Sequence, residues 1–266
     1  VSVKAAFQTA ALGKYYDCIT PSGAGGQPFQ IYNLYKFGYS NGASAAMPLA
    51  AFLFMQLAFV LLALLVFLFN GNVVDTAAIK VPAYIGVVMY ALVPGFIVLF
   101  MIRPDTARKI LLFVIRIGTK LKIVKDPDKT TASLTKSLEE YNQSMRLFIK
   151  DKKLLLKLAV FSLLYQIAMM SIPFFVLHAY NGTEGFFKIF CMTVFIYCAI
   201  TIVPTPGNSG AAEASFYMIF SGLKSSSSFW AMMIWRLMSY YTFILIGLGI
   251  YAYNAVSVRL KSRRKT

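Results

Sequence analysis

Long apolar runs dominate the pattern of hydrophobic and polar residues along the chain. Four of them are longer than about 18 residues with few charged positions, and they cover residues 44–69, 79–102, 154–178 and 228–253. A run of this length is typical of a helix that crosses a lipid bilayer. The pattern therefore predicts an all-α integral membrane protein, a polytopic helical bundle with four full spans.

Two further apolar stretches, residues 3–37 and 187–222, are interrupted by Pro and Gly. The segment "TPSGAGGQP" breaks the first stretch and "PTPGNSG" breaks the second. Pro lacks an N–H group and disfavours helix in the residue before it, and residues 211–222 are too short to cross a bilayer at about 1.5 Å per residue. Each stretch predicts a re-entrant helical hairpin, with an ordinary kinked helix as the alternative.

The distribution of charge predicts the orientation of the spans. The chain has a formal net charge of +16, although it is 58% hydrophobic and only 14% charged. Most of the excess lies in the loop of residues 103–153, with thirteen basic and six acidic side chains, and in the C-terminal "RLKSRRKT". The positive-inside rule predicts that both are cytoplasmic in a multi-pass protein of the cell (plasma) membrane. The hairpin at 3–37 then enters from the inner face and that at 187–222 from the outer face, which is typical of an inverted repeat.

The basic loop predicts two helices of its own. In residues 107–125, Lys109, Arg116 and Lys120 share one face of an otherwise apolar helix, which suits the inner membrane interface. A second helix follows, whose apolar residues recur at spacings of three and four. This stripe predicts packing on the bundle, with a partner protein as the alternative. It consists of Leu134, Leu138, Tyr141, Met145 and Phe148.

Neither composition nor motifs point to a soluble enzyme. The segment "PSGAGGQP" lacks the Gly-Lys-Ser/Thr of a P-loop, His178 is the only histidine, and the three cysteines form no metal-binding pattern. We therefore expect no catalytic residue, no metal and no cofactor. Because the basic residues flank apolar runs, we expect a membrane and no nucleic acid as partner. The sequence opens at Val1 rather than Met, so we also expect an earlier natural start with further N-terminal helices.

The two Pro/Gly turns supply the candidate site. A half-helix that begins after such a turn presents unpaired N–H groups, and its positive end attracts anions. Glycine also lets a headgroup approach the main chain closely. The candidate lipid-headgroup and translocation residues in the turns are Pro21, Gly23, Gly25, Gly26, Gln27, Pro204, Pro206, Gly207, Asn208 and Gly210.

Three ionisable residues lie close to these turns. Asp17 precedes the first turn, Glu213 falls in the first turn of the returning half-helix, and Arg236 lies about two turns into the last run. Charges at such depth are costly and usually face a cavity or one another. One hypothesis is a headgroup site, with Arg236 for phosphate and both carboxylates for a cationic headgroup. The other is a structural ion pair between Glu213 and Arg236.

Three motifs resemble the transmembrane region of the lysylphosphatidylglycerol synthase family, also called the multiple peptide resistance factor or flippase-like family. They are "ITPSGAGGQPFQIYNLYKFGYS", "PTPGNSGAAEASF" and "WRLMSYYTFILIG", in the family's order. The resemblance implies a protein that moves anionic or aminoacylated phosphatidylglycerol between leaflets and thereby confers resistance to cationic peptides. Asn208 and Ser209 stand where the family more usually has Gly and an apolar residue, which predicts extra side-chain hydrogen bonding at the second turn.

The resemblance leaves more than one function open. The leading hypothesis is a lipid translocase formed by residues 1–266 as one flippase-like domain. The alternative is the membrane part of a phosphatidylglycerol lysyltransferase, since the synthase domain of two-part members is absent from this sequence. A non-transporting membrane scaffold is the third hypothesis. The partners implied are a phospholipid, the membrane, and either a second copy or a separate synthase domain.

Overall fold

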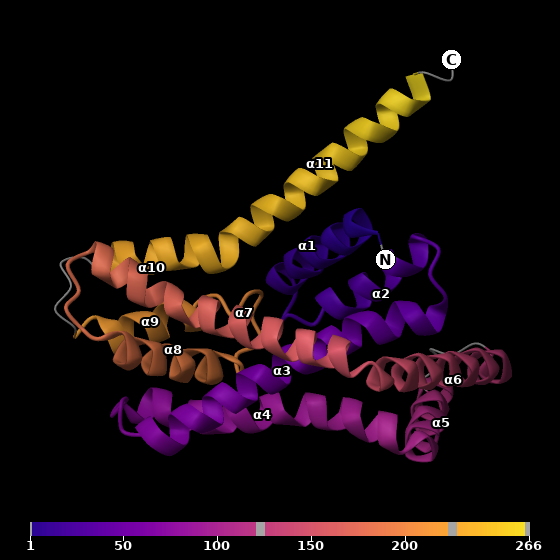
Figure 1. The fold of residues 1–266 in the computed structure, drawn as a ribbon, viewed down its shortest axis with the longest axis horizontal. Coiled ribbons are helices and arrows are strands. Elements are labelled where there is room, and N and C mark those ends of the chain that lie inside the picture. The colour runs from indigo at the N-terminus through magenta and orange to yellow at the C-terminus, as the bar shows by residue number, and fades with distance from the viewer. Residues whose placement is uncertain (1, 121–125, 223–227, 264–266) are drawn as a thin grey trace.

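A computed structural model describes residues 2–120, 126–222 and 228–263, and this part of the chain is helical with no regular strand. The arrangement is shown in Figure 1. The elements are α1 (Val3–Ile19), α2 (Gly26–Lys36), α3 (Asn41–Asn70), α4 (Ala77–Ile102), α5 (Pro104–Lys120), α6 (Pro127–Lys150), α7 (Lys152–Ala179), α8 (Phe186–Ile200), α9 (Ala211–Phe220), α10 (Ser228–Arg236), η1 (Leu237–Tyr241) and α11 (Thr242–Arg263).

The four predicted spans are confirmed as long apolar helices. Those long and apolar enough to cross a membrane are α3, α4, α7 and the segment Ser228–Asn254. The sequence predicted the last one as a single span. It is instead interrupted by the π-helical turn η1, which follows α10 and precedes α11. A π turn widens the helix by one residue and is frequent at functional sites. Here it comes directly after Arg236.

The centre of the bundle is formed by α8, which is too short to be a full span by itself but is almost entirely buried. It packs against α4, α7 and α9. A Cβ atom at Gly86 would collide with the carbonyl oxygen of Cys198, so only glycine allows α4 to approach α8 this closely. Outward-facing leucines and aromatic residues on α3, α4 and α7 are exposed. An apolar core inside an apolar surface is the arrangement expected of a protein solvated by lipid.

The basic loop folds as two helices at one end of the bundle. The predicted packing of the α6 stripe on the bundle is confirmed, because Tyr141 and Met145 are buried against the first turns of α3. Leu134, at the start of the stripe, remains exposed. A carboxylate oxygen of Glu140 accepts the N–H of Gly42 at 3.1 Å and thereby fixes the start of α3 on α6.

The predicted interfacial helix is α5, which Figure 1 shows foreshortened at the end of α4, so that it runs across the direction of the spans. Its apolar residues Phe113, Val114 and Ile117 are exposed, as is the basic Arg116. An amphipathic helix with this exposure suits a membrane interface. Of the predicted basic positions, Lys122, Lys125, Arg264 and Lys265 lie outside the described residues.

The two interrupted stretches form helical hairpins that point toward each other along the bundle (Figure 1). The pair α1–α2 opens toward the end where α3 meets α6, and α8–α9 opens toward the end where α7 terminates. Within the first hairpin, α1 ends at Ile19 and α2 begins at Gly26. Within the second, α8 ends at Ile200 and α9 begins at Ala211. Entry of both hairpins into a bilayer, and the inverted repeat, stay predictions that this opposed arrangement favours.

Candidate functional site

The turns of the two hairpins meet. Pro21 in the first turn and Pro206 in the second form an antiparallel backbone bridge. Each is the Pro of a Thr-Pro pair, so equivalent positions of the two hairpins lie opposite each other. Both prolines are exposed. The two opposed turns are therefore in direct contact.

The first turn, between α1 and α2, is held together by its own threonine. The Thr20 hydroxyl donates to the carbonyl oxygen of Tyr16 at 2.6 Å and accepts the N–H of Gly25 at 2.8 Å. Ser22 and Gly23 adopt left-handed backbone with φ of 53° and 66°. The Asp17 carboxylate lies beside Gly26, the first residue of α2. A carboxylate at the start of a helix satisfies an unpaired donor and the helix dipole.

The second turn, between α8 and α9, uses the same residue types. The Thr205 hydroxyl donates to the carbonyl oxygen of Ser209 at 2.9 Å, and a carboxylate oxygen of Glu213 accepts the N–H of Gly210 at 2.6 Å. Glu213 thus caps α9 as Asp17 caps α2. Three residues of this turn have left-handed φ, namely Gly207 at 58°, Asn208 at 53° and Gly210 at 86°. Gly207 and Gly210, both predicted site residues, occupy two of these positions, where glycine is favoured because it has no Cβ atom.

Arg236 of α10 closes onto the second turn. Its Nε lies 2.5 Å from a carboxylate oxygen of Glu213. One terminal nitrogen donates to the carbonyl oxygen of Gly207 at 3.3 Å and to the Ser209 hydroxyl at 3.1 Å. The Nε–H has no well-directed hydrogen-bond acceptor, so the contact with Glu213 is an ion pair held by charge. The side chain of Arg236 is only 6% exposed, against 27% for Glu213.

Tyr240, in the π turn η1, connects both hairpins to the last span. Its hydroxyl donates to the carbonyl oxygen of Cys18 at 3.2 Å, just before the first turn. Its ring lies against Gly207 of the second turn, where a Cβ atom would overlap it. The guanidinium of Arg236 lies 4.3 Å above the centre of the same ring, a distance typical of a cation–π contact. One side chain therefore contacts both turns and the buried cation.

A second charge pair lies beside the first turn. The Lys14 ammonium is 3.9 Å from a carboxylate oxygen of Asp17, one helical turn away on α1. It also lies 5.6 Å from the centre of the Tyr165 ring on α7. Each hairpin thus has a carboxylate that caps the returning half-helix and a cation that pairs with this carboxylate. In the first hairpin these are Asp17 and Lys14, and in the second Glu213 and Arg236.

The structure brings together most of the predicted site residues. Pro21, Pro206, Gly207, Glu213 and Arg236 belong to one connected set of contacts. Ser209 supplies the extra hydrogen bond predicted from its departure from the family motif. Two other candidates are not part of this set. Pro204 is exposed, and the amide oxygen of Gln27 is buried without a hydrogen-bond partner among the described residues.

Two contributors were absent from the predicted set, Lys14 and Tyr240. The sequence does contain a signal for each of them. Tyr240 follows Arg236 by four residues, which places both on one helix face, and Lys14 precedes Asp17 by three residues.

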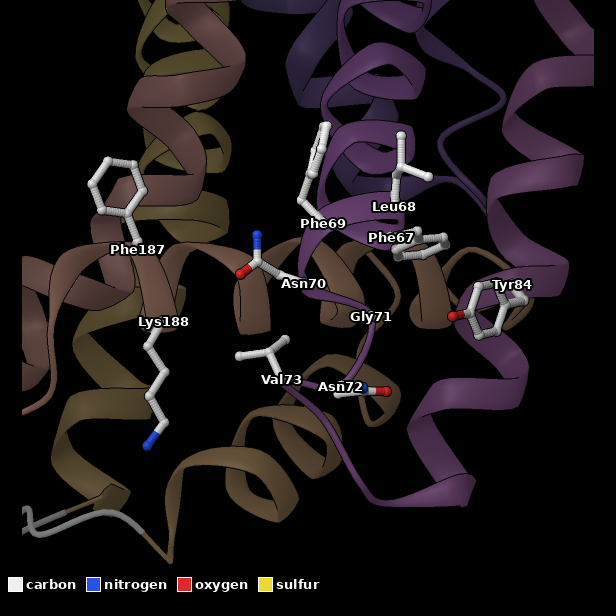
Figure 2. Close-up of a pocket in the computed structure, with 10 residues that line it drawn as sticks. All are labelled: Phe67, Leu68, Phe69, Asn70, Gly71, Asn72, Val73, Tyr84, Phe187 and Lys188. Carbon is white, nitrogen blue, oxygen red and sulfur yellow. The ribbon is translucent and has the colours of Figure 1, made fainter.

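An open surface pocket lies elsewhere, at the far end of α8. Its volume is about 630 Å³, and it is lined by the α3–α4 loop with Tyr84, Phe187 and Lys188. Figure 2 shows Tyr84 on one side of the loop and the two α8 residues on the other. None of the predicted site residues lines it. The 15 residues of α8 separate it from the turns by about 20 Å at 1.5 Å per residue, so we base the site on the turns.

The sequence relatives agree with this architecture. The profile of the family described as "Lysylphosphatidylglycerol synthase TM region" matches residues 1–247, nearly the whole chain. The chain belongs to this family. The chain is also similar to a UPF0104 membrane protein of Archaeoglobus fulgidus, with 25% identity over 251 residues that cover 93% of this chain and 75% of the relative. No solved structure matches the chain. Family membership confirms the resemblance drawn from the three motifs.

Proposed function

We propose that this protein is a phospholipid translocase of the cell membrane, and that lipid headgroups pass beside the two touching turns. The observation that carries the proposal is the contact between Pro21 and Pro206, flanked on each side by a carboxylate–cation pair. The lipid class that we propose is anionic or aminoacylated phosphatidylglycerol. Its exposure on the outer leaflet would reduce surface charge and protect against cationic peptides.

The physical argument starts from the cost of placing a headgroup within a bilayer. A charged side chain at the centre of a membrane helix costs on the order of 3 kcal/mol on insertion scales, and a phosphate faces a cost of the same kind. Polar backbone is tolerated at that depth only where it is packed in protein or lines a cavity. The turn residues Pro21, Pro206 and Gly210 are exposed, so the non-helical main chain of both turns lies at the surface of the bundle.

The opposed hairpins provide this surface for headgroups arriving from either leaflet. The hairpin α1–α2 opens toward the basic helices α5 and α6, which we place in the cytoplasm, and α8–α9 opens toward the other face. The acyl chains would stay in the bilayer against the exposed leucines of α3 and α7.

The experiment is a leaflet assay on the purified chain in liposomes. Phosphatidylglycerol with a fluorescent acyl chain is reconstituted with the protein, and the fraction quenched by external dithionite is followed over time. Gly207→Leu, Gly210→Leu and Glu213→Ala should each reduce the rate of translocation severalfold without preventing membrane insertion. Gly95→Leu is the matched control, because Gly95 is an exposed helical glycine of α4 with nothing near its Cβ position.

Two results would remove the proposal. Liposomes with the native chain could show no more translocation than liposomes without protein, or all three turn variants could transport at the native rate with normal protein levels. Equal losses in the turn variants and in Gly95→Leu would also count against it, because added bulk anywhere on the bundle would then explain the effect.

The family description favours one second candidate, the membrane part of a phosphatidylglycerol lysyltransferase. In that case the chain would supply lipid to, or accept product from, a catalytic domain on a separate polypeptide. Co-expression with a soluble synthase domain of the family would test this. Formation of aminoacylated phosphatidylglycerol that depends on the present chain, with no leaflet exchange by the chain alone, would favour the second candidate over translocation.

A further inference from the structure

Each carboxylate–cation pair consists of one acidic and one basic side chain, but the two pairs differ in solvent exposure. In the second hairpin, Arg236 is only 6% exposed and is already engaged by Glu213, by two oxygen atoms of the turn and by the Tyr240 ring. A ligand would have to displace these contacts to reach the guanidinium. The Arg236 pair therefore fits a lock that holds α10 to the second turn.

The first hairpin holds a cation that is still accessible. The side chain of Lys14 is 37% exposed and that of Asp17 is 25% exposed. Their closest charged atoms are 3.9 Å apart, which is beyond the length of a hydrogen bond. A lysine ammonium carries three N–H donors. The Asp17 carboxylate lies beside Gly26 at the start of α2, and Lys14 keeps donor capacity.

We infer that Lys14 binds the anionic phosphate oxygen of a lipid, with Asp17 as a competing anion that is displaced when the phosphate arrives. The inference rests on the proposed function, since it names the residue that receives the headgroup on the side of the first hairpin. It departs from the sequence-based hypothesis, in which Arg236 was the phosphate ligand. Tyr165 of α7, whose ring faces the ammonium, forms the opposite wall of this site.

The two residues of the pair should behave oppositely. Lys14→Gln removes the donor and should lower the affinity for anionic lipid about tenfold or more, because hydrogen bonds to charged groups are among the strong ones. Asp17→Asn removes the competing anion and should raise the affinity. A purely structural ion pair predicts something else, namely that both variants lose stability and neither gains affinity.

The experiment measures lipid retention by native mass spectrometry on the full chain purified in detergent, titrated with phosphatidylglycerol or with zwitterionic phosphatidylcholine. Lys4→Gln is the matched control, because Lys4 is an exposed lysine on the same helix. Lys14→Arg should keep binding. If Lys14→Gln does not fold, the neutral double variant Lys14→Gln/Asp17→Asn takes its place. Free glycerol phosphate serves as a competitor that distinguishes a lipid headgroup from a soluble phosphate ligand.

The expected result is loss of phosphatidylglycerol with Lys14→Gln, a gain with Asp17→Asn and no change with Lys4→Gln. Native retention in Lys14→Gln overturns the inference, as does an equal loss in Lys14→Gln and Asp17→Asn. Complete displacement by equimolar glycerol phosphate overturns the assignment to a lipid. The readout is independent of transport. Retention that depends on Lys14 without any leaflet exchange would refute the proposed function alone, and native retention in Lys14→Gln with leaflet exchange by the native chain would refute this inference alone.

Discussion

Gly207 and Gly210 lie three residues apart in the second turn, and their alanine variants should differ in stability by a calculable amount. Both have left-handed φ, at 58° and 86°. A non-glycine residue held in such a conformation costs of order 1–3 kcal/mol. Nothing lies near the Cβ position of Gly210, whereas a Cβ atom on Gly207 overlaps the ring of Tyr240. Gly210→Ala should therefore show the backbone cost alone.

The overlap at Gly207 is not easily relieved. The Tyr240 ring is fixed by its hydroxyl on the Cys18 carbonyl oxygen and by Arg236 above it. Forcing extra volume into a packed site typically costs about 1–3 kcal/mol, so Gly207→Ala should lose about that amount in addition to its backbone cost. In a chain of this size each kcal/mol corresponds to about 2–4 °C in the unfolding midpoint.

The assay is thermal unfolding of the purified variants in one detergent, repeated in a Tyr240→Ala background. Without the ring, the loss of stability caused by Gly207→Ala should shrink by this packing cost, whereas the loss caused by Gly210→Ala should not change. A double-mutant cycle between positions 207 and 240 measures the packing cost directly. An additive cycle would refute the account of Gly207 as a contact point.

Three further predictions follow from other parts of the structure. Arg236→Gln should destabilise the chain by about 3–5 kcal/mol, since it leaves a partly buried carboxylate unpaired. The double variant Arg236→Gln/Glu213→Gln should recover part of this loss. Unfolding in detergent measures both, and a double variant no more stable than the single one contradicts the ion-pair account. A cysteine at Ser133 should resist membrane-impermeant maleimide in intact cells, because we place α6 in the cytoplasm, and efficient labelling would invert the topology. Arg116→Glu should weaken binding of an isolated α5 peptide to vesicles containing phosphatidylglycerol, since basic residues near such a surface contribute about 1 kcal/mol each; unchanged binding would show that α5 is not an interfacial helix.

Much of the fold could be predicted because the bilayer imposes simple rules on sequence. A long apolar run must be helical in lipid, so α3, α4 and α7 could be placed to within a few residues. The Thr-Pro turns could be placed because Pro is followed there by several Gly residues. Pro alone is not a sufficient signal, since Pro48, Pro94 and Pro173 lie inside helices. The π turn could not be predicted, since it depends on how α10 and α11 pack on other elements rather than on any residue within Leu237–Tyr241.

The candidate site was predicted in part for the same reason. Local chemistry marked Gly207 and Glu213, because turn glycines and a carboxylate at a helix start have local signatures. The partner of each group, in contrast, is determined by tertiary packing. The sequence left two hypotheses for Arg236, a phosphate ligand and a structural ion pair with Glu213. Its burial and its contacts with Glu213 and Ser209 favour the second. Lys14 was missed because it lies in a moderately apolar stretch and its neighbour Tyr165 is distant in sequence.

The π turn in the last span has a consequence for evolution within the family. It accommodates one residue more than an α-helical turn would, so it is equivalent to a single insertion absorbed by the helix. Deleting one residue from Leu237–Tyr241 would restore regular winding and rotate everything beyond it by about 100° relative to Arg236. Relatives whose sequence is one residue shorter here should have lost the aromatic ring that faces the second turn. Selection on a bare glycine at position 207 should then be relaxed, so that the length of this segment and the identity of that residue change together across lineages.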